Sequence, residues 1–367
     1  MNVAEFFFEL DDLRREGSTY HVLSDIVMIV LCGYLCDCEG FEEVYDYALD
    51  KHELLKEFLE LPCGIPSHDT LNRAFRLIDP DQLEAILLQW GKNIVGVLTD
   101  KHLIVDGKQL RGTRTKGRKQ ANVQIVSLWA EGERMCLAQG QIAEKTNEIK
   151  AIPEILKPLD IKGSVLTIDA IGCQKSLCEL IVTDKKADYV IGLKANQDGL
   201  YEQVVSHFER VKSSLSPHVS RDLGHGRAEK RTVSVSEDLR WLDAATGFVG
   251  LRSVVCVESI RWVNQKEEQS KRFYISSLLG VDAARMGGYI RRHWSIENEL
   301  HWHLDVTFNE DACRVRTDYA PRNLTTVRKV SLGLLKRDPT KMSLARKRKK
   351  AARDDAFLKS LLSQLDS

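Results

Sequence analysis

One stretch of the chain, Tyr289 to Arg316, combines carboxylate and imidazole side chains at helical spacing. Apolar residues recur at intervals of three and four as far as Leu304, which predicts a helix. Steps of four place His293, Glu297 and His301 on nearly one face of that helix. Because a carboxylate between imidazoles is costly to bury without a partner, we expect Glu297 to face a cation.

Two aspartates elsewhere in the chain share a local pattern. Asp106 and Asp169 each follow three or four apolar residues and precede a glycine-containing turn. Either side chain could simply cap its turn. In α/β sheets, however, ligands bind at the carboxyl ends of parallel strands, so the two carboxylates are expected to converge if their strands are neighbours. Together with Glu297, they predict a single site.

Three carboxylates on separate elements suit Mg²⁺ or Mn²⁺, which prefer oxygen ligands. Two-metal sites of this kind support phosphoryl transfer by in-line displacement, with water or a 3′-hydroxyl as the attacking group. The rival interpretation is a Zn²⁺ site formed by His293, His301 and His303 with Glu297. The sequence lacks an HExxH motif, and zinc would leave both aspartates without a role. We therefore rank the zinc site lower.

Basic residues near these positions are expected to hold phosphates without reading base sequence. Residues 108–119 contain six basic side chains and link the Asp106 strand to the next one. Such a run is often only a solvated loop, but its place beside Asp106 favours phosphate binding. The candidates for DNA contact are Lys108, Arg111, Arg114, Lys194, Arg227, Arg292 and His293.

The elements that would position this site follow a recognisable order. From residue 101 the patterns predict three strands, a helix, a strand ending at Asp169, a second helix and a further strand. This is the order of an RNase H-like domain, an α/β fold with a mixed sheet flanked by helices. Residues 196–285 are too many for a loop and predict a mainly β insertion, with a helix at 200–213 and strands at 230–236, 248–258 and 271–279.

The pattern divides the chain into three parts. Residues 1–98 read as an all-helical domain, 99–337 as the RNase H-like domain, and 338–367 as a basic C-terminal tail. The helix predicted after Ser67 resembles the second helix of a helix-turn-helix. Acidic residues outnumber basic ones across 1–98, which favours packing or dimerisation over DNA contact for that helix.

Composition excludes several classes of protein. The 53 basic and 53 acidic residues cancel, so a nucleic acid must be held by local patches. Nine cysteines without paired CxxC motifs argue against a disulfide framework or zinc ribbon and favour reduced thiols. The most apolar run, residues 26–36, is too short to cross a bilayer, and the N-terminus lacks the features of a signal peptide. We expect a cytoplasmic protein.

Long motifs give the chain a family resemblance. They are GSTYHVLSDIVMIVLCGYL, GIPSHDTLNRAF, IVDGKQLRGT, KTNEIKAIPEIL, LTIDAIGCQ, YVIGLKANQ and RRHWSIENELHWHLDVTFNEDACRVR. With these motifs the chain resembles the H-repeat-associated insertion-sequence transposases, which belong to the DDE superfamily. The resemblance implies metal-dependent hydrolysis of phosphodiesters at insertion-sequence ends and strand transfer to target DNA. It maps the catalytic and metal-binding triad onto Asp106, Asp169 and Glu297, and paired DNA ends imply a homodimer on DNA.

The resemblance has one departure on the Glu297 helix. The wider group places an arginine and a lysine at set distances from the glutamate, and here those positions hold His293 and Leu304. Arg292 is adjacent and could substitute for the arginine, and Asp305 is a fallback third carboxylate. The alternative function is a catalytically inactive or repurposed DNA-binding protein of the same fold.

Overall fold

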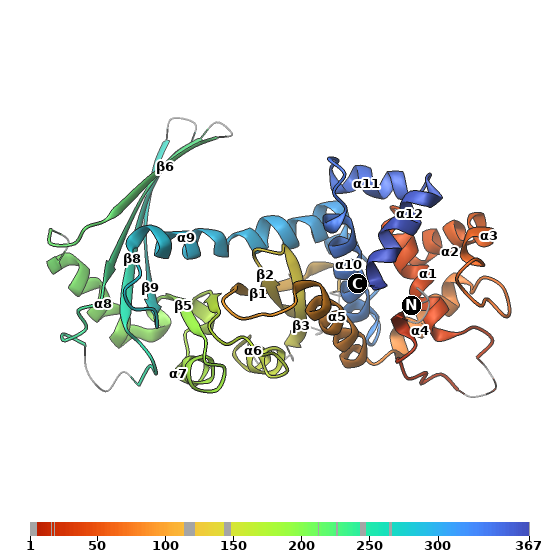
Figure 1. The fold of residues 1–367 in the computed structure, drawn as a ribbon, viewed down its shortest axis with the longest axis horizontal. Coiled ribbons are helices and arrows are strands. Elements are labelled where there is room, and N and C mark those ends of the chain that lie inside the picture. Colours follow the sequence, from red (N-terminus) through yellow and green to blue (C-terminus); the bar gives the residue numbers. More distant parts are fainter. Residues whose placement is uncertain are drawn as a thin grey trace.

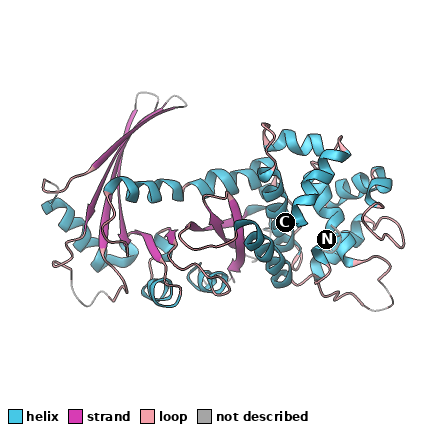
Figure 2. Ribbon diagram, in the orientation of Figure 1, coloured by secondary structure: helices cyan, strands magenta, loops and turns pink. Residues whose placement is uncertain are grey.

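The alternating and wholly apolar segments of the sequence pair side by side in one mixed sheet (Figure 2). The computed structural model describes residues 6–15, 17, 19–113, 122–142, 148–211, 213–224, 227–242, 247–263 and 266–366. The strands are β1 (His102–Leu110), β2 (Val123–Ala130), β3 (Met135–Ile142), β4 (Val165–Ile168), β5 (Asp188–Leu193), β6 (His218–Gly224), β7 (Arg227–Ser236), β8 (Ser253–Val263) and β9 (Lys266–Ser276). Their order in the sheet is β3-β2-β1-β4-β5-β9-β8-β7-β6.

The first five strands have the RNase H-like arrangement expected from the sequence. β1 is antiparallel to β2 and parallel to β4, and β4 is parallel to β5. Val105 of β1 pairs with Ile168 of β4, so Asp106 and Asp169 come next on neighbouring strands. The sequence predicted that β1 ends at Asp106, and this is wrong. The strand continues to Leu110, because it stays paired with β2 as far as Val123.

The β-rich insertion is not a separate subdomain, since it extends the same sheet. β9 pairs antiparallel with β5, and β8, β7 and β6 follow outward. Helix α8 (Asp198–Val211) lies close to its predicted place. β6 was not predicted because its sequence, HVSRDLG, is too polar to show an apolar strand pattern.

The helices between the strands lie along the sheet, while most of the N-terminal helices gather at one end of the molecule (Figure 1). The N-terminal helices are α1 (Leu23–Leu35), α2 (Phe41–Asp50), α3 (His52–Leu55), α4 (His68–Leu77) and α5 (Pro80–Val95), of which α5 packs against β3. Every residue of α1 is buried, which explains its continuous apolar run. The elements between strands include η2 (Arg111–Thr113), α6 (Glu148–Leu156), η3 (Ala170–Gly172), α7 (Lys175–Glu179), η4 (Leu180–Asp184) and η5 (Ala195–Gln197).

The C-terminal segment corrects the tail expected at 338–367. It forms α11 (Leu344–Ala351), α12 (Asp355–Leu362) and η10 (Ser363–Asp366), which follow α10 (Ala320–Arg337) and pack with the N-terminal helices. Arg348 is 1% exposed, and its guanidinium donates to the carbonyl oxygens of Tyr34, Cys38 and Thr307. The basic run therefore contributes to the core, because its cations bind carbonyls left free at helix ends.

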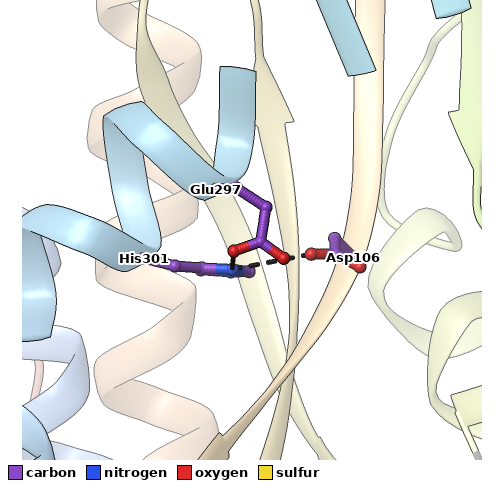
Figure 3. A group of neighbouring side chains, drawn as sticks. All are labelled: Asp106, Glu297 and His301. Carbon is purple, nitrogen blue, oxygen red and sulfur yellow. Dashed lines mark ion pairs between the residues drawn. The ribbon is translucent and has the colours of Figure 1, made fainter. Parts of the chain in front are cut away.

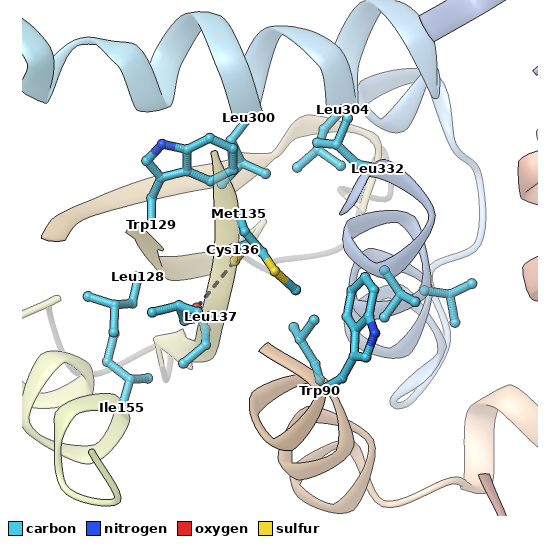
Figure 4. Packing of buried hydrophobic residues seen from close by; sticks show 14 of the residues in the cluster. Trp90, Leu128, Trp129, Met135, Cys136, Leu137, Ile155, Leu300, Leu304 and Leu332 are labelled. Atoms are coloured by element: carbon cyan, nitrogen blue, oxygen red, sulfur yellow. Dashed lines mark hydrogen bonds between the residues drawn. The ribbon is translucent and has the colours of Figure 1, made fainter. Parts of the chain in front are cut away.

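One long helix connects the insertion to the helical end of the molecule (Figure 1). It comprises α9 (Ala283–His293) and the π-helical segments η7 (Glu297–His301) and η8 (His303–Thr307), and is followed by η9 (Glu310–Ala312). We call residues 283–307 the long helix. Ile296, Leu300 and Leu304 are buried along one side of it. Figure 4 shows Leu300 and Leu304 in the core that also contains Trp129, Leu332 and Trp90. Within the described part of the chain, no helix has the length and apolar character needed to cross a membrane.

Candidate metal and DNA site

Asp106, Glu297 and His301 converge from two elements (Figure 3). Their ligand atoms all lie within 4.8 Å of one another. His301 Nδ1 is 3.5 Å from Asp106 Oδ2 and 3.6 Å from Glu297 Oε2. We call these residues the Asp106 cluster. The predicted convergence of Asp106 with Glu297 is therefore seen, and His301 joins them.

Secondary structure explains this convergence. β1 is a central strand: Asp106 is paired with Ser127 of β2, and the preceding Val105 is paired with Ile168 of β4. The long helix supplies Glu297 and His301 one turn apart, while Ile296 and Leu300 hold its other side in the core. The turn that carries the two ligands is π-helical, a wider geometry that is frequent at functional sites.

Glu297 is the accessible member of the cluster. Its side chain is 53% exposed, whereas that of His301 is 6% exposed. The neighbouring His301 is the largest influence and holds the pKa of Glu297 below its ordinary value, with Lys108 adding a smaller effect. Among the described residues, no lysine or arginine lies within ion-pair distance of Glu297. Its charge therefore remains available to a ligand.

Asp169 lies beside this cluster but is not one of its three members. It directly follows β4 and caps η3, where its Oδ1 accepts the backbone N–H of Ile171 at 3.0 Å. The capping role that the sequence left open is thus present. Register nevertheless places Asp169 next to Asp106, because residues 105 and 168 are paired on parallel strands about 4.8 Å apart.

His293 connects β4, the strand that precedes Asp169, to the long helix. Its Nδ1 lies 3.1 Å from Thr167 Oγ1, on β4. Burial lowers the pKa of His293, while the charges of Asp169 and Glu297 oppose that shift. A neutral imidazole therefore lies near both carboxylates, and it can donate or accept a hydrogen bond there.

Lys108 has a different place from the one predicted. Its side chain is 11% exposed, and its Nζ donates to Asp305 and, at 2.6 Å, to Glu310. Glu310 is almost wholly buried and also accepts from Thr325 Oγ1, with Arg328 3.6 Å away. We call Lys108, Asp305, Glu310 and Arg328 the Lys108 cluster. These pairings correct the prediction of phosphate contact by Lys108 and remove Asp305 as a fallback ligand.

The other predicted DNA contacts are spread around the site. Arg111 is 80% exposed beside Asp311, and Arg292 is half exposed with its Nε 3.5 Å from Glu131. Lys194 is exposed at the end of β5. Arg227 begins β7, and its side chain lies outside the described part; Arg114 lies wholly outside the described residues.

A cavity of about 500 Å³ opens beside the predicted site. Its lining includes Asp169, Lys194, Lys271, Arg272, His293 and Trp294. The Arg272 guanidinium lies over the Trp294 ring, 5.1 Å from its centroid. Sequence reasoning missed Lys271 and Arg272 because only the pairing of β9 with β5 brings them here. Cations and an exposed aromatic ring suit a nucleic-acid strand.

The residues present fit a divalent cation. Asp106 and Glu297 supply carboxylate oxygens from two rigid elements, and Asp169 stands on the adjacent strand. The three-histidine zinc site gains no support, because His303 Nδ1 lies 3.1 Å from Thr307 Oγ1 and His303 is outside the cluster. Burial, with Lys336 adding to it, lowers the pKa of His303 to about 4.

Comparison with known proteins gives consistent matches along the chain. A family model described as "Transposase DDE domain" matches residues 98–324, and one described as "DDE_Tnp_1-associated" matches residues 4–91. The chain is 33% identical to "Putative transposase YncI" of Escherichia coli O157:H7, over 99% of this chain and 94% of that protein. It is 32% identical to "H repeat-associated putative transposase YhhI" of Escherichia coli (strain K12), over 96% of each. A cryo-EM structure of a piggyBac transposase synaptic complex with hairpin DNA aligns with a TM-score of 0.44 and 12% identity, covering 99% of this chain and 77% of that one.

Proposed function

This chain belongs to the DDE transposase family, and we propose that Asp106, Asp169 and Glu297 form its catalytic, metal-binding triad. Its function is DNA transposition, within the H-repeat-associated group. The proposed reaction is hydrolysis of a phosphodiester at each end of an insertion sequence, followed by joining of the freed 3′-hydroxyl to target DNA. The observation that carries this proposal is the convergence of Asp106 and Glu297, with Asp169 on the adjacent strand.

The three carboxylates would hold Mg²⁺ or Mn²⁺. Divalent ions bound there would supply activation of the attacking hydroxyl and charge stabilisation of the leaving oxygen. The chain's own contribution is to fix the ligands: β1 and β4 carry the aspartates on neighbouring strands, and the long helix brings Glu297 close to Asp106. A glutamate carboxyl group is already ionised at neutral pH, and the lowered pKa of Glu297 extends its ionised form to more acidic solution.

DNA would lie across the carboxyl ends of β4 and β5 and against the long helix. Lys194 and His293 line the cavity in this region. Arg292 lies on the same long helix and pairs with Glu131 in the turn after β2, and Arg111 follows β1. We propose that these residues contact the phosphate backbone, which positions the scissile bond without reading sequence. Arg114 and Arg227 remain candidates outside the described side chains.

The proposal also covers the organisation of the chain. Residues 99–337 would form the catalytic unit, with the helices of 1–98 packed at one end. Paired insertion-sequence ends favour a homodimer on DNA, with one catalytic site acting at each end.

Cleavage of DNA that carries the insertion-sequence ends tests this function. Wild-type protein with Mg²⁺ or Mn²⁺ should nick at the element boundary, and chelation should stop it. Asp169→Asn should bind the same DNA in a mobility-shift assay but fail to nick it. Equal nicking by both proteins would contradict the proposed triad. DNA binding without any metal-dependent nicking would instead favour the repurposed DNA-binding protein.

A further inference from the structure

We infer that His301 supplies a nitrogen ligand to the divalent cation proposed for this site, and that the site therefore prefers Mn²⁺ to Mg²⁺. The inference rests on the proposed function, because it concerns the same cation. It assigns a role to a residue outside the Asp106, Asp169 and Glu297 triad.

The first argument is the position of the imidazole. His301 Nδ1 faces Asp106 and Glu297, and the three donor atoms come from a central strand and one turn of the long helix (Figure 3). The separations of 3.5 and 3.6 Å are longer than ordinary N–H···O hydrogen bonds of about 2.7–3.2 Å. They are close to the spacing of donors that share one ion, which is roughly 3.0–3.5 Å for ligand distances near 2.1 Å.

The second argument compares His301 with a buried histidine that has a structural role. His207 Nε2 lies 2.8 Å from Ser236 Oγ, and its ring stacks on Trp241 at 4.3 Å. His301 has no such bond: its Nε2 is buried and finds no hydrogen-bond partner among the described residues. The polar contacts of the His301 ring are thus those of its Nδ1 with the carboxylates of Asp106 and Glu297.

Packing fixes the position of the His301 ring. It is 5% exposed, and its neighbours Leu300 and Leu304 are buried in the core. A ligand held by packing loses little conformational freedom on binding, which favours coordination. Mg²⁺ demands near-ideal octahedral coordination by oxygen and gives up its waters reluctantly, whereas the transition-metal ion Mn²⁺ accepts a nitrogen donor more readily. A nitrogen donor among the carboxylates therefore biases the site toward Mn²⁺.

Pulsed electron paramagnetic resonance of bound Mn²⁺ tests this inference on the full-length protein. Coordination by an imidazole produces ¹⁴N modulation, which ¹⁵N-histidine labelling should alter. We expect the modulation in the wild type and its loss in His301→Asn. His303→Asn and His293→Asn are matched controls on the same helix and should retain it. His301→Asn should also weaken Mn²⁺ binding by roughly tenfold or more while changing Mg²⁺ binding less.

Every other outcome counts against the inference. Bound Mn²⁺ without ¹⁴N modulation in the wild type would overturn the inference and leave the proposed triad intact. This outcome is measured on the wild-type protein alone, so it does not depend on whether a variant folds. Loss of the modulation in His293→Asn instead of His301→Asn would also overturn it. Absence of bound Mn²⁺ would overturn both the inference and the proposed metal site.

Discussion

The same strand and helix build two clusters with opposite character. Asp106 and Lys108 are two residues apart on β1, while Glu297, His301 and Asp305 follow at intervals of four on the long helix. In the Lys108 cluster, Asp305 and Glu310 are neutralised by a lysine that is 11% exposed. In the Asp106 cluster, Glu297 is 53% exposed and faces an imidazole.

This difference separates carboxylates that hold the fold from those available for chemistry. Buried carboxylates need a paired cation because an isolated buried charge is costly. The Lys108 cluster satisfies that need and fixes the long helix against β1. The Asp106 cluster lies next to the Lys108 cluster, between the same strand and the same helix. The ion pairs of the Lys108 cluster therefore hold the residues of the Asp106 cluster in position, while the charge of Glu297 stays available to a ligand.

The largest expected effect comes from removing the charge of Glu297. Glu297→Gln should lower the rate of metal-dependent nicking by about 10³-fold, since it removes roughly 4 kcal/mol of electrostatic stabilisation at about 1.4 kcal/mol per tenfold. Its thermal unfolding midpoint should stay close to the wild-type value because the side chain is half exposed. Single-turnover cleavage and calorimetry measure the two quantities.

Glu299 provides the control, two residues away on the same helix. It bonds to Lys336 at 2.6 Å and to Arg134, so its role is structural. Glu299→Gln should nick DNA at nearly the wild-type rate. Equal losses of activity in both variants would mean that the helix, and not the Asp106 cluster, limits the reaction.

The next effect concerns stability. Lys108→Met should lower the free energy of unfolding by about 3–5 kcal/mol, because it leaves Glu310 buried without its nearest cation. Urea unfolding followed by circular dichroism measures this loss. Lys194→Met is the matched substitution at the exposed end of β5 and should stay within about 0.5 kcal/mol. A small loss for Lys108→Met would show that the two clusters do not differ in structural role.

The start of β1 offers a third contact with the long helix, where His102 lies against Tyr289. Burial lowers the pKa of His102 to about 3, with Arg292 and His293 adding to the shift. The unfolded chain, with a histidine pKa near 6.5, therefore binds the proton more readily, so stability is greatest above about pH 6.5 and falls as pH decreases toward 3. Between pH 6.5 and 5 the loss from this group should be about 1.6 kcal/mol.

Unfolding measured at several pH values checks this expectation. His102→Gln should make the free energy of unfolding less dependent on pH in that range. An identical slope for His102→Gln and the wild type would show that His102 is not held neutral in the folded state.

The smallest effect is expected at the rim of the site. Lys194→Ala should weaken DNA binding by about 1 kcal/mol or less for every DNA sequence. It should also make the slope of log binding constant against log salt concentration shallower by about one unit, the contribution of one phosphate contact. Binding isotherms at several salt concentrations measure both. Lys162→Ala, exposed in the turn before β4 at the other end of the parallel strands, is the control and should change neither. A sequence-dependent loss for Lys194→Ala would indicate base contact instead.

Much of the fold could be predicted because its signals are local. Apolar runs and helical spacing predicted the order of elements along the chain from β1 to β5 and the face shared by Glu297 and His301. Charge partners are different, since they depend on tertiary contacts: Lys108 reads as a loop cation until Glu310, far along the chain, is placed beside it. Arg348 likewise reads as part of a basic tail until the carbonyls of α1 and the long helix surround it.

Localised backbone cleavage by bound iron tests the three-carboxylate site most directly. Fe²⁺ substituted for Mg²⁺ and treated with ascorbate and peroxide generates hydroxyl radicals that cut the nearest peptide segments. The account predicts cuts around residues 106, 169 and 297–301 together, all suppressed by excess Mn²⁺ and lost in Glu297→Gln. Cuts that spare the segment around Asp169, or that fall elsewhere in the chain, would contradict a single site formed by these three carboxylates.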